Sequence, residues 1–192
     1  ILGDEDRLAA AARDFVAHYE KRIEESATVN GKAMFVCSNR FIAFDLYKAI
    51  EKLRPEWTQI AGYDEEGLTA EERRNLKPIE RMKLVMTRGK DDPKEMYDML
   101  GTDEDRKEFA RQFKSDKSNF KIAIVVDMWL TGFDVPSLDT IYIDKPIQKH
   151  SLIQAVSRVN RVYEGKARGL IVDYIGIKKN LNGAVKTYTG GQ

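Results

Sequence analysis

The sequence contains a single cysteine and only two histidines among its 192 residues. One cysteine cannot form a disulfide within the chain, which fits a protein of the reducing cytoplasm. Cys37 stands in an apolar run and is expected to be a small buried residue. His18 and His150 are far apart in the sequence, and with one cysteine they do not give the ligand spacing of a structural zinc site.

Long apolar runs and an excess of one charge are missing as well. No segment approaches the roughly 20 apolar residues of a membrane-spanning helix, so no membrane is expected as a partner. The acidic start at residues 3–6 does not resemble a signal peptide, and without an initiating Met we expect the chain to be part of a longer protein. Because the formal net charge is +1, any surface for nucleic acid has to be a local basic patch.

The chain also lacks the parts that a nucleotide hydrolase needs to work alone. The phosphate loop G-x-x-x-x-G-K-[ST] is missing, because Gly31-Lys32 has neither the earlier glycine nor the following Ser or Thr. No acidic metal-binding pair follows an apolar strand, and no carboxylate cluster with a nearby lysine indicates a nuclease. The acidic groups at 64–66 and 103–105 are predicted to be solvated surfaces.

Short apolar runs alternate with helical patterns along most of the chain. The runs predict strands at 33–37, 57–61, 122–126, 140–143 and 170–172. Apolar residues at three- and four-residue steps predict helices at 6–25, 41–53 and 152–161, with a closing helix at 180–186. This alternation predicts an α/β fold in which helices flank a parallel sheet.

Residues 63–118 are dense in charge and poor in β-branched residues. We interpret them as a helical insertion within one domain that spans 1–192. Phe109 and Phe113 stand four residues apart, so they could anchor the last helix of the insertion onto the sheet.

The segment 127–136, Asp-Met-Trp-Leu-Thr-Gly-Phe-Asp-Val-Pro, directly follows a predicted strand. Ligands of open parallel sheets bind at the carboxyl ends of the strands, where this segment begins. Gly132 allows the backbone to approach a phosphate or a sugar without a Cβ in the way. Thr131 offers a hydroxyl, and Asp134 offers a carboxylate for a ribose hydroxyl.

The predicted helix at 152–161 places Gln154, Arg158 and Arg161 within about 60° of one another, opposite its apolar stripe. Two guanidinium groups and an amide on one side suit a polyphosphate, because the planar fork of arginine matches phosphate oxygens. Other interpretations are open for these residues taken alone. Ser151 and Gln154 have the spacing of a capping box, and the two arginines could pair with acidic residues on a solvated face.

The order of these motifs resembles the second RecA-like domain of superfamily 2 helicases and translocases. Residues 34–40 (Met-Phe-Val-Cys-Ser-Asn-Arg) resemble motif IV of that superfamily, 131–134 resemble motif V, and Gln154 to Arg161 resemble the arginine-finger motif VI. The wider string 127–136, followed by Lys145-Pro146 and the motif VI helix, is similar to the motor subunit (R, HsdR) of type I restriction enzymes. The resemblance covers most of the chain and is strongest over 120–175.

The resemblance implies a three-layer RecA-like fold and the role of a second motor domain. Arg158 and Arg161 would be catalytic, reaching ATP and Mg²⁺ that the preceding RecA-like domain mainly holds. Gln154, Gly132 and Asp134 would contact the nucleotide. A final set would contact the backbone of double-stranded DNA: Ser38, Asn39, Arg40 and Thr131. The parent enzyme would be an ATP-dependent type I site-specific deoxyribonuclease with modification and specificity subunits, and this chain alone would be inactive.

Three alternatives are open at this stage. The first is a DNA-repair or RNA helicase of the same superfamily, which shares the short motifs. The second is a non-catalytic α/β module that binds nucleic acid or protein and needs no exposed cluster of Gln154, Arg158 and Arg161. The third, a small-molecule nucleotide enzyme, is disfavoured because no glycine-rich fingerprint follows the first strand.

Overall fold

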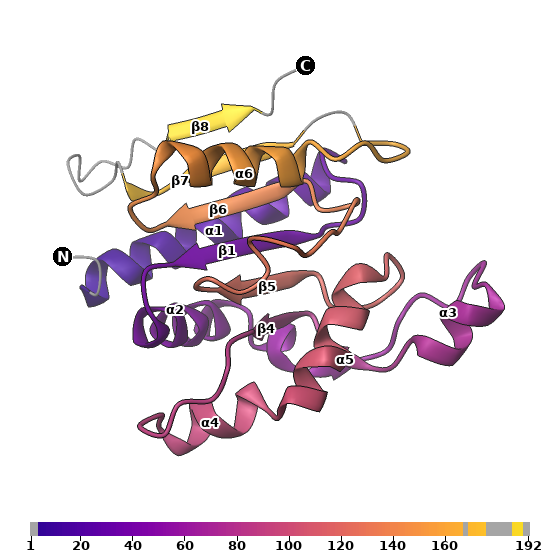
Figure 1. The fold of residues 1–192 in the computed structure, drawn as a ribbon, viewed down its shortest axis with the longest axis horizontal. Coiled ribbons are helices and arrows are strands. Elements are labelled where there is room, and N and C mark those ends of the chain that lie inside the picture. Colours follow the sequence, from indigo (N-terminus) through magenta and orange to yellow (C-terminus); the bar gives the residue numbers. More distant parts are fainter. Residues whose placement is uncertain (1–3, 167–168, 176–185, 190–192) are drawn as a thin grey trace.

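The computed structural model of the protein describes residues 4–166, 169–175 and 186–189. At its centre is a six-stranded sheet in the order β4-β5-β1-β6-β7-β8 (Figure 1). The strands are β1 (Ala33–Cys37), β4 (Met82–Leu84), β5 (Ile122–Val125), β6 (Thr140–Asp144), β7 (Leu170–Asp173) and β8 (Lys186–Thr189). All neighbouring pairs are parallel except β7 and β8, which are antiparallel.

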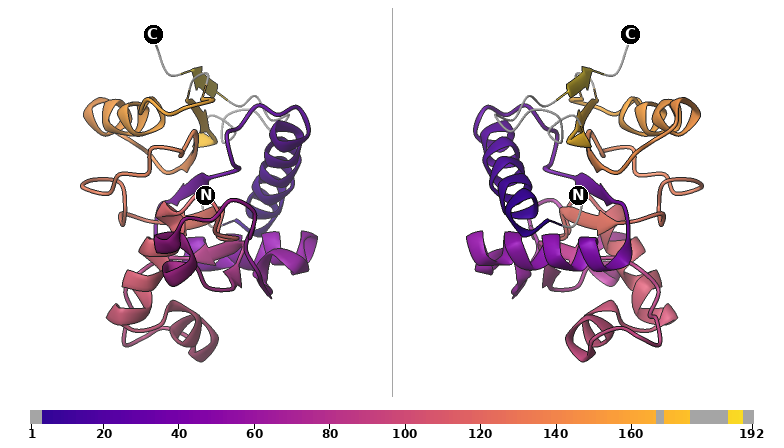
Figure 2. Two further views of the ribbon diagram at one scale, coloured as in Figure 1. Left: turned by 90° about the vertical axis from the view of Figure 1, so that its right-hand side faces the viewer. Right: turned by 90° about the vertical axis from the view of Figure 1, so that its left-hand side faces the viewer.

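Helices cover both faces of this sheet. The helices α1 (Glu5–Glu24) and α2 (Arg40–Leu53) lie on one face, and α5 (Asp103–Lys114) and α6 (Lys149–Val159) lie on the other (Figure 2). The three-layer parallel α/β fold expected from the alternating pattern is therefore confirmed. Of the predicted helices, 6–25 and 41–53 agree with α1 and α2 to within one residue at each end.

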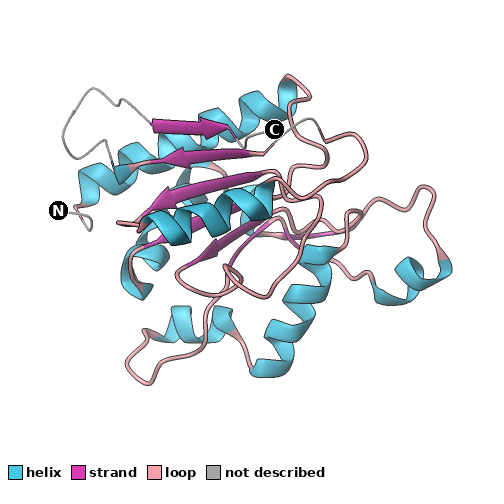
Figure 3. Ribbon diagram, turned by 45° about the horizontal axis from the view of Figure 1, so that its top comes forward, coloured by secondary structure: helices cyan, strands magenta, loops and turns pink. Residues whose placement is uncertain are grey.

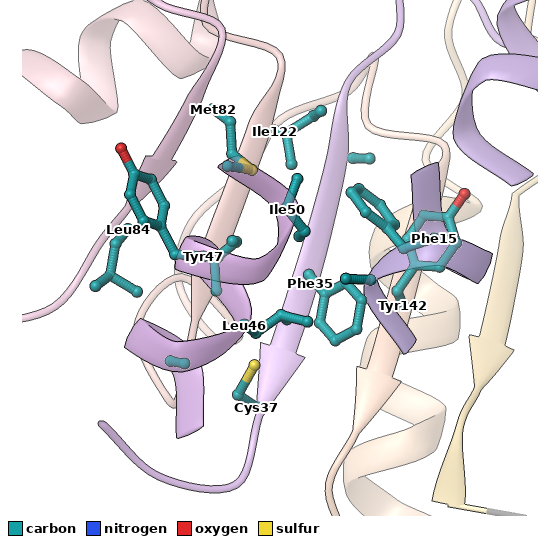
Figure 4. Close-up of a cluster of buried hydrophobic side chains, with 14 of the residues drawn as sticks. Phe15, Phe35, Cys37, Leu46, Tyr47, Ile50, Met82, Leu84, Ile122 and Tyr142 are labelled. Atoms are coloured by element: carbon teal, nitrogen blue, oxygen red, sulfur yellow. The ribbon is translucent and has the colours of Figure 1, made fainter. Parts of the chain in front are cut away.

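Alternate residues of the central strands fill two separate cores. In β1, Phe35 and Cys37 face α1 and α2, whereas Met34 and Val36 face α5 and α6. Figure 4 shows the first core, in which Phe15 of α1 packs edge-on against Phe35 of β1 and Tyr142 of β6. All five residues of β1 are buried, as expected for a strand with neighbours on both sides and helices on both faces.

The strand predicted at 57–61 is wrong. Trp57 belongs to a short 3₁₀ helix, η1 (Pro55–Thr58), and its ring packs edge-on against Phe15 and Tyr19 of α1. Only β2 (Ile60–Ala61) is extended, and it pairs with β3 (Ile79–Glu80) in a separate two-stranded ribbon. The apolar character of Trp57 thus reflects packing under a helix and not membership of the sheet.

The range 63–118 contains one strand of the main sheet that the sequence did not indicate. Its helices are α3 (Ala70–Asn75), α4 (Lys94–Leu100) and α5, which fits the predicted helical content. However, β4 also lies in this range and pairs with β5 at the sheet edge, so the range is not wholly an insertion. Phe113 of α5 is fully buried and Phe109 is partly buried against the same core, as predicted.

Two features at the carboxyl-terminal end differ from, or lie outside, the predictions. Helix α6 begins three residues earlier than predicted and ends at Val159, before Arg161. Figure 3 distinguishes the helices from the strands by colour. Most of the closing helix predicted at 180–186 lies outside the described residues, and its last residue, Lys186, opens β8. None of the helices in the described part of the chain has the length and apolar character to cross a membrane.

Candidate functional site

The segment 126–139 crosses the sheet instead of staying at its edge. It joins β5 to β6, and these strands lie on opposite sides of β1, so the connection has to pass over β1. Met34 and Val36 of β1 line one cavity together with Trp129 and Thr131, which places the crossing on the face that carries α6.

Helix α6 runs antiparallel to the strands and ends near their amino ends. Its last residue, Val159, meets Gly169, which stands one residue before β7. The candidate site therefore lies on the sheet face and extends toward the amino ends of β6 and β7. This differs from the carboxyl-edge position that the general rule for parallel sheets predicts. The physical reason is that segment 126–139 starts at the carboxyl end of β5 but has to return to the amino end of β6.

Segment 126–139 and α6 together form an open cavity of about 370 Å³. It is lined by Thr131, Asp134, Gln154, Ser157, Arg158 and Arg161. The structure thus brings Gln154, Arg158 and Arg161 together, as predicted, although only Gln154 and Arg158 lie on the helix and Arg161 follows its end. It also adds Thr131 and Asp134 from a segment about 20 residues earlier in the chain.

Both arginines of this cavity are accessible to solvent. Arg161 directs its Nε to within 3.2 Å of both carboxylate oxygens of Asp134, and the two side chains are 55% and 49% exposed. Arg158 is partly buried, and its side chain has no hydrogen bond or ion pair within the described part of the chain. The described residues therefore place these arginines in no buried internal salt bridge, the arrangement that would have favoured the non-catalytic α/β module.

Lys166 fixes the relative position of the two segments, and the sequence did not indicate it. Its Nζ donates hydrogen bonds to the carbonyl oxygens of Arg161, Pro136 and Leu138 over 2.8, 3.1 and 2.9 Å. One ammonium group thereby ties the end of segment 126–139 to the residues that follow α6. Partial burial lowers the pKa of Lys166, with nearby Asp139 and Asp134 acting in the opposite direction.

Ser157 is a second residue of the cavity that the sequence analysis missed. It stands three residues after Gln154, so helical spacing alone would have placed it on the same face. Its hydroxyl donates to the carbonyl oxygen of Ile153 over 3.0 Å, within the helix.

A second, deeper cavity of about 370 Å³ adjoins the first and shares Thr131, Gln154 and Arg158 with it. Its floor is formed by aliphatic side chains of β1 and β6. At its rim, Lys145 donates a 3.1 Å hydrogen bond to Asp127, linking the ends of β6 and β5. Lys145 belongs to the Lys145-Pro146 pair of the family resemblance.

Gly132 has a conformational role that its sequence context did not indicate. Its φ is +68°, in the left-handed region, and a Cβ there would meet no atom within 4 Å. Glycine is therefore favoured by the backbone conformation and not by a close contact within the chain.

Ser38, Asn39 and Arg40 lie apart from the arginine cavity, at the carboxyl end of β1. Ser38 donates to the carbonyl oxygen of Asp144, and Asn39 caps α2 by accepting hydrogen bonds from two backbone N–H groups. The guanidinium of Arg40 pairs with Asp92 at 2.6 Å. Within the described residues, the two cavities lined by Thr131 include none of the three, so the predicted nucleic-acid contacts divide into two places.

The capping box proposed for Ser151 and Gln154 is absent. The helix begins at Lys149, and Gln148 before it makes no side-chain capping hydrogen bond. Gln154 is therefore a residue of the helix interior, and its side chain is exposed. Cys37 is buried as expected, and this burial raises the pKa of its thiol. In the described residues, His, Cys, Asp and Glu side chains form no group of three or more suited to a metal.

Comparison with known proteins identifies the family. A family model described as type I restriction enzyme subunit R domain 3 matches residues 29–176. The chain belongs to this family. The R-subunit domain is 42% identical over 192 residues to the type I restriction enzyme HindI endonuclease subunit of Haemophilus influenzae, covering 98% of the chain and 16% of that protein. It is 39% identical over 190 residues to the MjaIXP endonuclease subunit of Methanocaldococcus jannaschii, with coverage of 98% and 16%.

The R-subunit domain spans about a sixth of the length of these two relatives. Among solved structures, it resembles a fragment of an HsdR subunit of a type I restriction enzyme from Vibrio vulnificus, with a TM-score of 0.52. The sequence identity is 15%, and the match covers 92% of this chain and 30% of that one. At this identity the likeness concerns the fold, which is the RecA-like arrangement predicted from the sequence.

Proposed function

We propose that this R-subunit domain is the second motor domain of an ATP-dependent DNA translocase, and that Arg158 and Arg161 act on the γ-phosphate of ATP. The parent would be an ATP-dependent type I site-specific deoxyribonuclease that works with modification and specificity subunits. The observation that carries the proposal is the shared cavity of Gln154, Arg158 and Arg161, with both guanidinium groups accessible. Guanidinium groups directed at a transferring phosphoryl group stabilise the charge of its transition state.

The residues of the cavity fit a triphosphate. Arg158, Arg161 and Gln154 supply N–H donors, and Thr131 adds a hydroxyl, which together match the acceptor oxygens of phosphates. Asp134 already pairs with Arg161, so a phosphate would have to displace it or share the guanidinium. The proposal assigns Mg²⁺ and most of the ATP contacts to a preceding RecA-like domain, because this chain has no phosphate loop.

The DNA contacts are assigned to two places. Ser38, Asn39 and Arg40 are at the carboxyl end of β1, and Thr131 is beside the arginines. Contact with backbone phosphates and not with base edges suits a motor that has to step along any sequence. Closure of the cleft between two motor domains around ATP, and its opening after hydrolysis, would change the contacts that these residues make with the DNA backbone.

The test uses the longer R subunit that carries this domain. Arg158→Ala and Arg161→Ala should each lower DNA-stimulated ATP turnover by about a thousandfold while leaving the fold intact. Arg111 on α5 is a matched control, because it is an exposed arginine paired with Glu108, and Arg111→Ala should leave turnover unchanged. Near-normal turnover in both cavity variants would refute the assignment. The isolated domain should show no DNA-stimulated turnover.

A further inference from the structure

The backbone of Trp129 adopts a conformation that is unusual for its residue type. Its φ is +70°, and Gly132, three residues later, has a φ of +68°. Glycine adopts such angles readily, whereas a bulky side chain there is strained and persists only where its surroundings fix it. Strain of this kind is common at functional sites, and here it lies two residues before Thr131 and five before Asp134.

The ring of Trp129 is held by an aromatic stack. It lies 4.4 Å from the ring of Phe133 at an interplanar angle of 14°, and 5.3 Å from Phe113 of α5 at 29°. The ammonium of Lys114, also on α5, lies 4.7 Å from the centre of the Phe133 ring. Two consecutive residues of α5 therefore contact the stack.

The stack closes a short loop. Trp129 and Phe133 are four residues apart, and their contact brings together the two ends of the stretch 130–132. Thr131 and Gly132 are exposed at the tip of this loop, whereas Phe133 is buried. Asp134 follows directly and is exposed beside Arg161. The position of the ring thus determines where Thr131 and Asp134 stand relative to α6.

We propose that Trp129 is a positioning residue, whose stack on Phe133 and Phe113 holds Thr131 and Asp134 toward Arg158 and Arg161. This inference rests on the proposed function, since it assigns Trp129 to the same nucleotide site. Trp129 does not line the open cavity in which Arg158 and Arg161 lie. It lines the adjoining deeper cavity, together with Arg158 and Gln154.

Three substitutions separate the ring from the backbone. Trp129→Ala removes the ring and keeps the strained backbone, Trp129→Gly removes the ring and relieves the strain, and Trp129→Phe keeps an aromatic ring. Phe109→Ala is the matched control, because Phe109 is an aromatic residue of α5 whose ring contacts Lys83 and forms no ring pair with the stacked residues in the described part of the chain. If the ring positions the loop, the Ala and Gly variants behave alike and the Phe variant retains most of the function.

The first measurement uses this chain and needs no nucleotide. NMR order parameters of the backbone amides at 130–134 should fall from about 0.85 to below about 0.6 in the Ala and Gly variants, and should be unchanged in the Phe109 variant. Unchanged order parameters in both ring-deletion variants would overturn the proposal.

The second measurement is ATP turnover in the longer R subunit. The Ala and Gly variants should lower kcat by at least about tenfold, because small displacements of positioned groups are costly, with a smaller change in KM and with rescue by Trp129→Phe. Wild-type turnover in Trp129→Gly would show that only the backbone matters and would overturn the proposal. If instead Arg158→Ala and Arg161→Ala leave turnover intact, the proposed function fails, and the order parameters still decide whether Trp129 holds the loop.

Discussion

The guanidinium Nε of Arg161 lies 3.2 Å from both carboxylate oxygens of Asp134, a residue 27 positions earlier in the chain. Asp134 belongs to the segment that crosses β1, and Arg161 follows the end of α6. The pair is about half exposed on both sides, so water screens it and its net stabilisation is small. The ion pair orients the guanidinium of Arg161. Because the pair is weak, an anion that binds more strongly can displace Asp134.

Substitution Asp134→Asn should strengthen the binding of inorganic triphosphate to this chain. The carboxylate competes with phosphate for Arg161, and an exposed ion pair of this kind changes affinity by about two- to fivefold. Triphosphate is the appropriate probe because it has no ribose for Asp134 to contact. Isothermal titration calorimetry of the wild type, Asp134→Asn and Arg161→Ala should give the tightest binding for the first variant and the weakest for the second. Weaker binding in Asp134→Asn would mean that Asp134 does not compete for Arg161.

Substitution Gly132→Ala should lower the free energy of unfolding by roughly 1–2 kcal/mol, because the left-handed conformation is unfavourable for a residue with a Cβ. The added methyl group would meet no atom within 4 Å, so no steric contribution is expected. Gly132→Asn should cost less, since asparagine tolerates this region. Urea denaturation of the two variants checks the order, and equal losses would indicate a cause other than backbone conformation.

Substitution Gly169→Ala should be far more destabilising, by about 3 kcal/mol or more. A Cβ at this position would lie 2.4 Å from the backbone oxygen of Val159, and a backbone atom at the end of α6 cannot move aside as a flexible side chain can. Gly62→Ala is the matched control, because a Cβ there meets nothing within 4 Å. Thermal or urea denaturation should separate the two variants clearly. A mild effect of Gly169→Ala would mean that α6 can shift away from β7.

Lys121 should make the stability of the protein depend on pH in the alkaline range. Burial lowers the pKa of Lys121 to about 8, and its Nζ donates a 2.8 Å hydrogen bond to the carbonyl oxygen of Asp116. Between pH 8 and the unfolded pKa of about 10.5, the unfolded chain binds more protons at this residue than the folded chain. The contribution of Lys121 to stability therefore rises across that window and is constant below it.

Substitution Lys121→Met tests this dependence. The difference in unfolding free energy between wild type and variant should shift in favour of the wild type by roughly 1–3 kcal/mol from pH 7.5 to 10.5. Comparing the two proteins cancels the titration of the other lysines and tyrosines. A constant difference across the window would show that Lys121 titrates normally in the folded protein.

Most of the elements could be predicted because their signals are local. The apolar run at 33–37 gives β1, and the periodic apolar positions of 6–25 give α1. The strand assigned to 57–61 failed because an aromatic residue packed under a helix looks the same in sequence as a strand residue. Edge strand β4 was missed because its three residues, Met-Lys-Leu, form a very short run with a charged residue at its centre, in a range of helical composition.

The spacing of Gln154 and Arg158 placed both on one face of a helix, and the motif order correctly indicated the type I restriction enzyme family. These properties are encoded locally, by the repeat of the helix and by the identity of neighbouring residues. Only the tertiary structure decided that Asp134 pairs with Arg161, that Lys166 ties their segments together, and that the cavity lies on the sheet face. These features depend on the strand order, which separates β5 and β6 by β1 and forces segment 126–139 across the sheet. Strand order results from the packing of the whole domain, so no local stretch of sequence contains it.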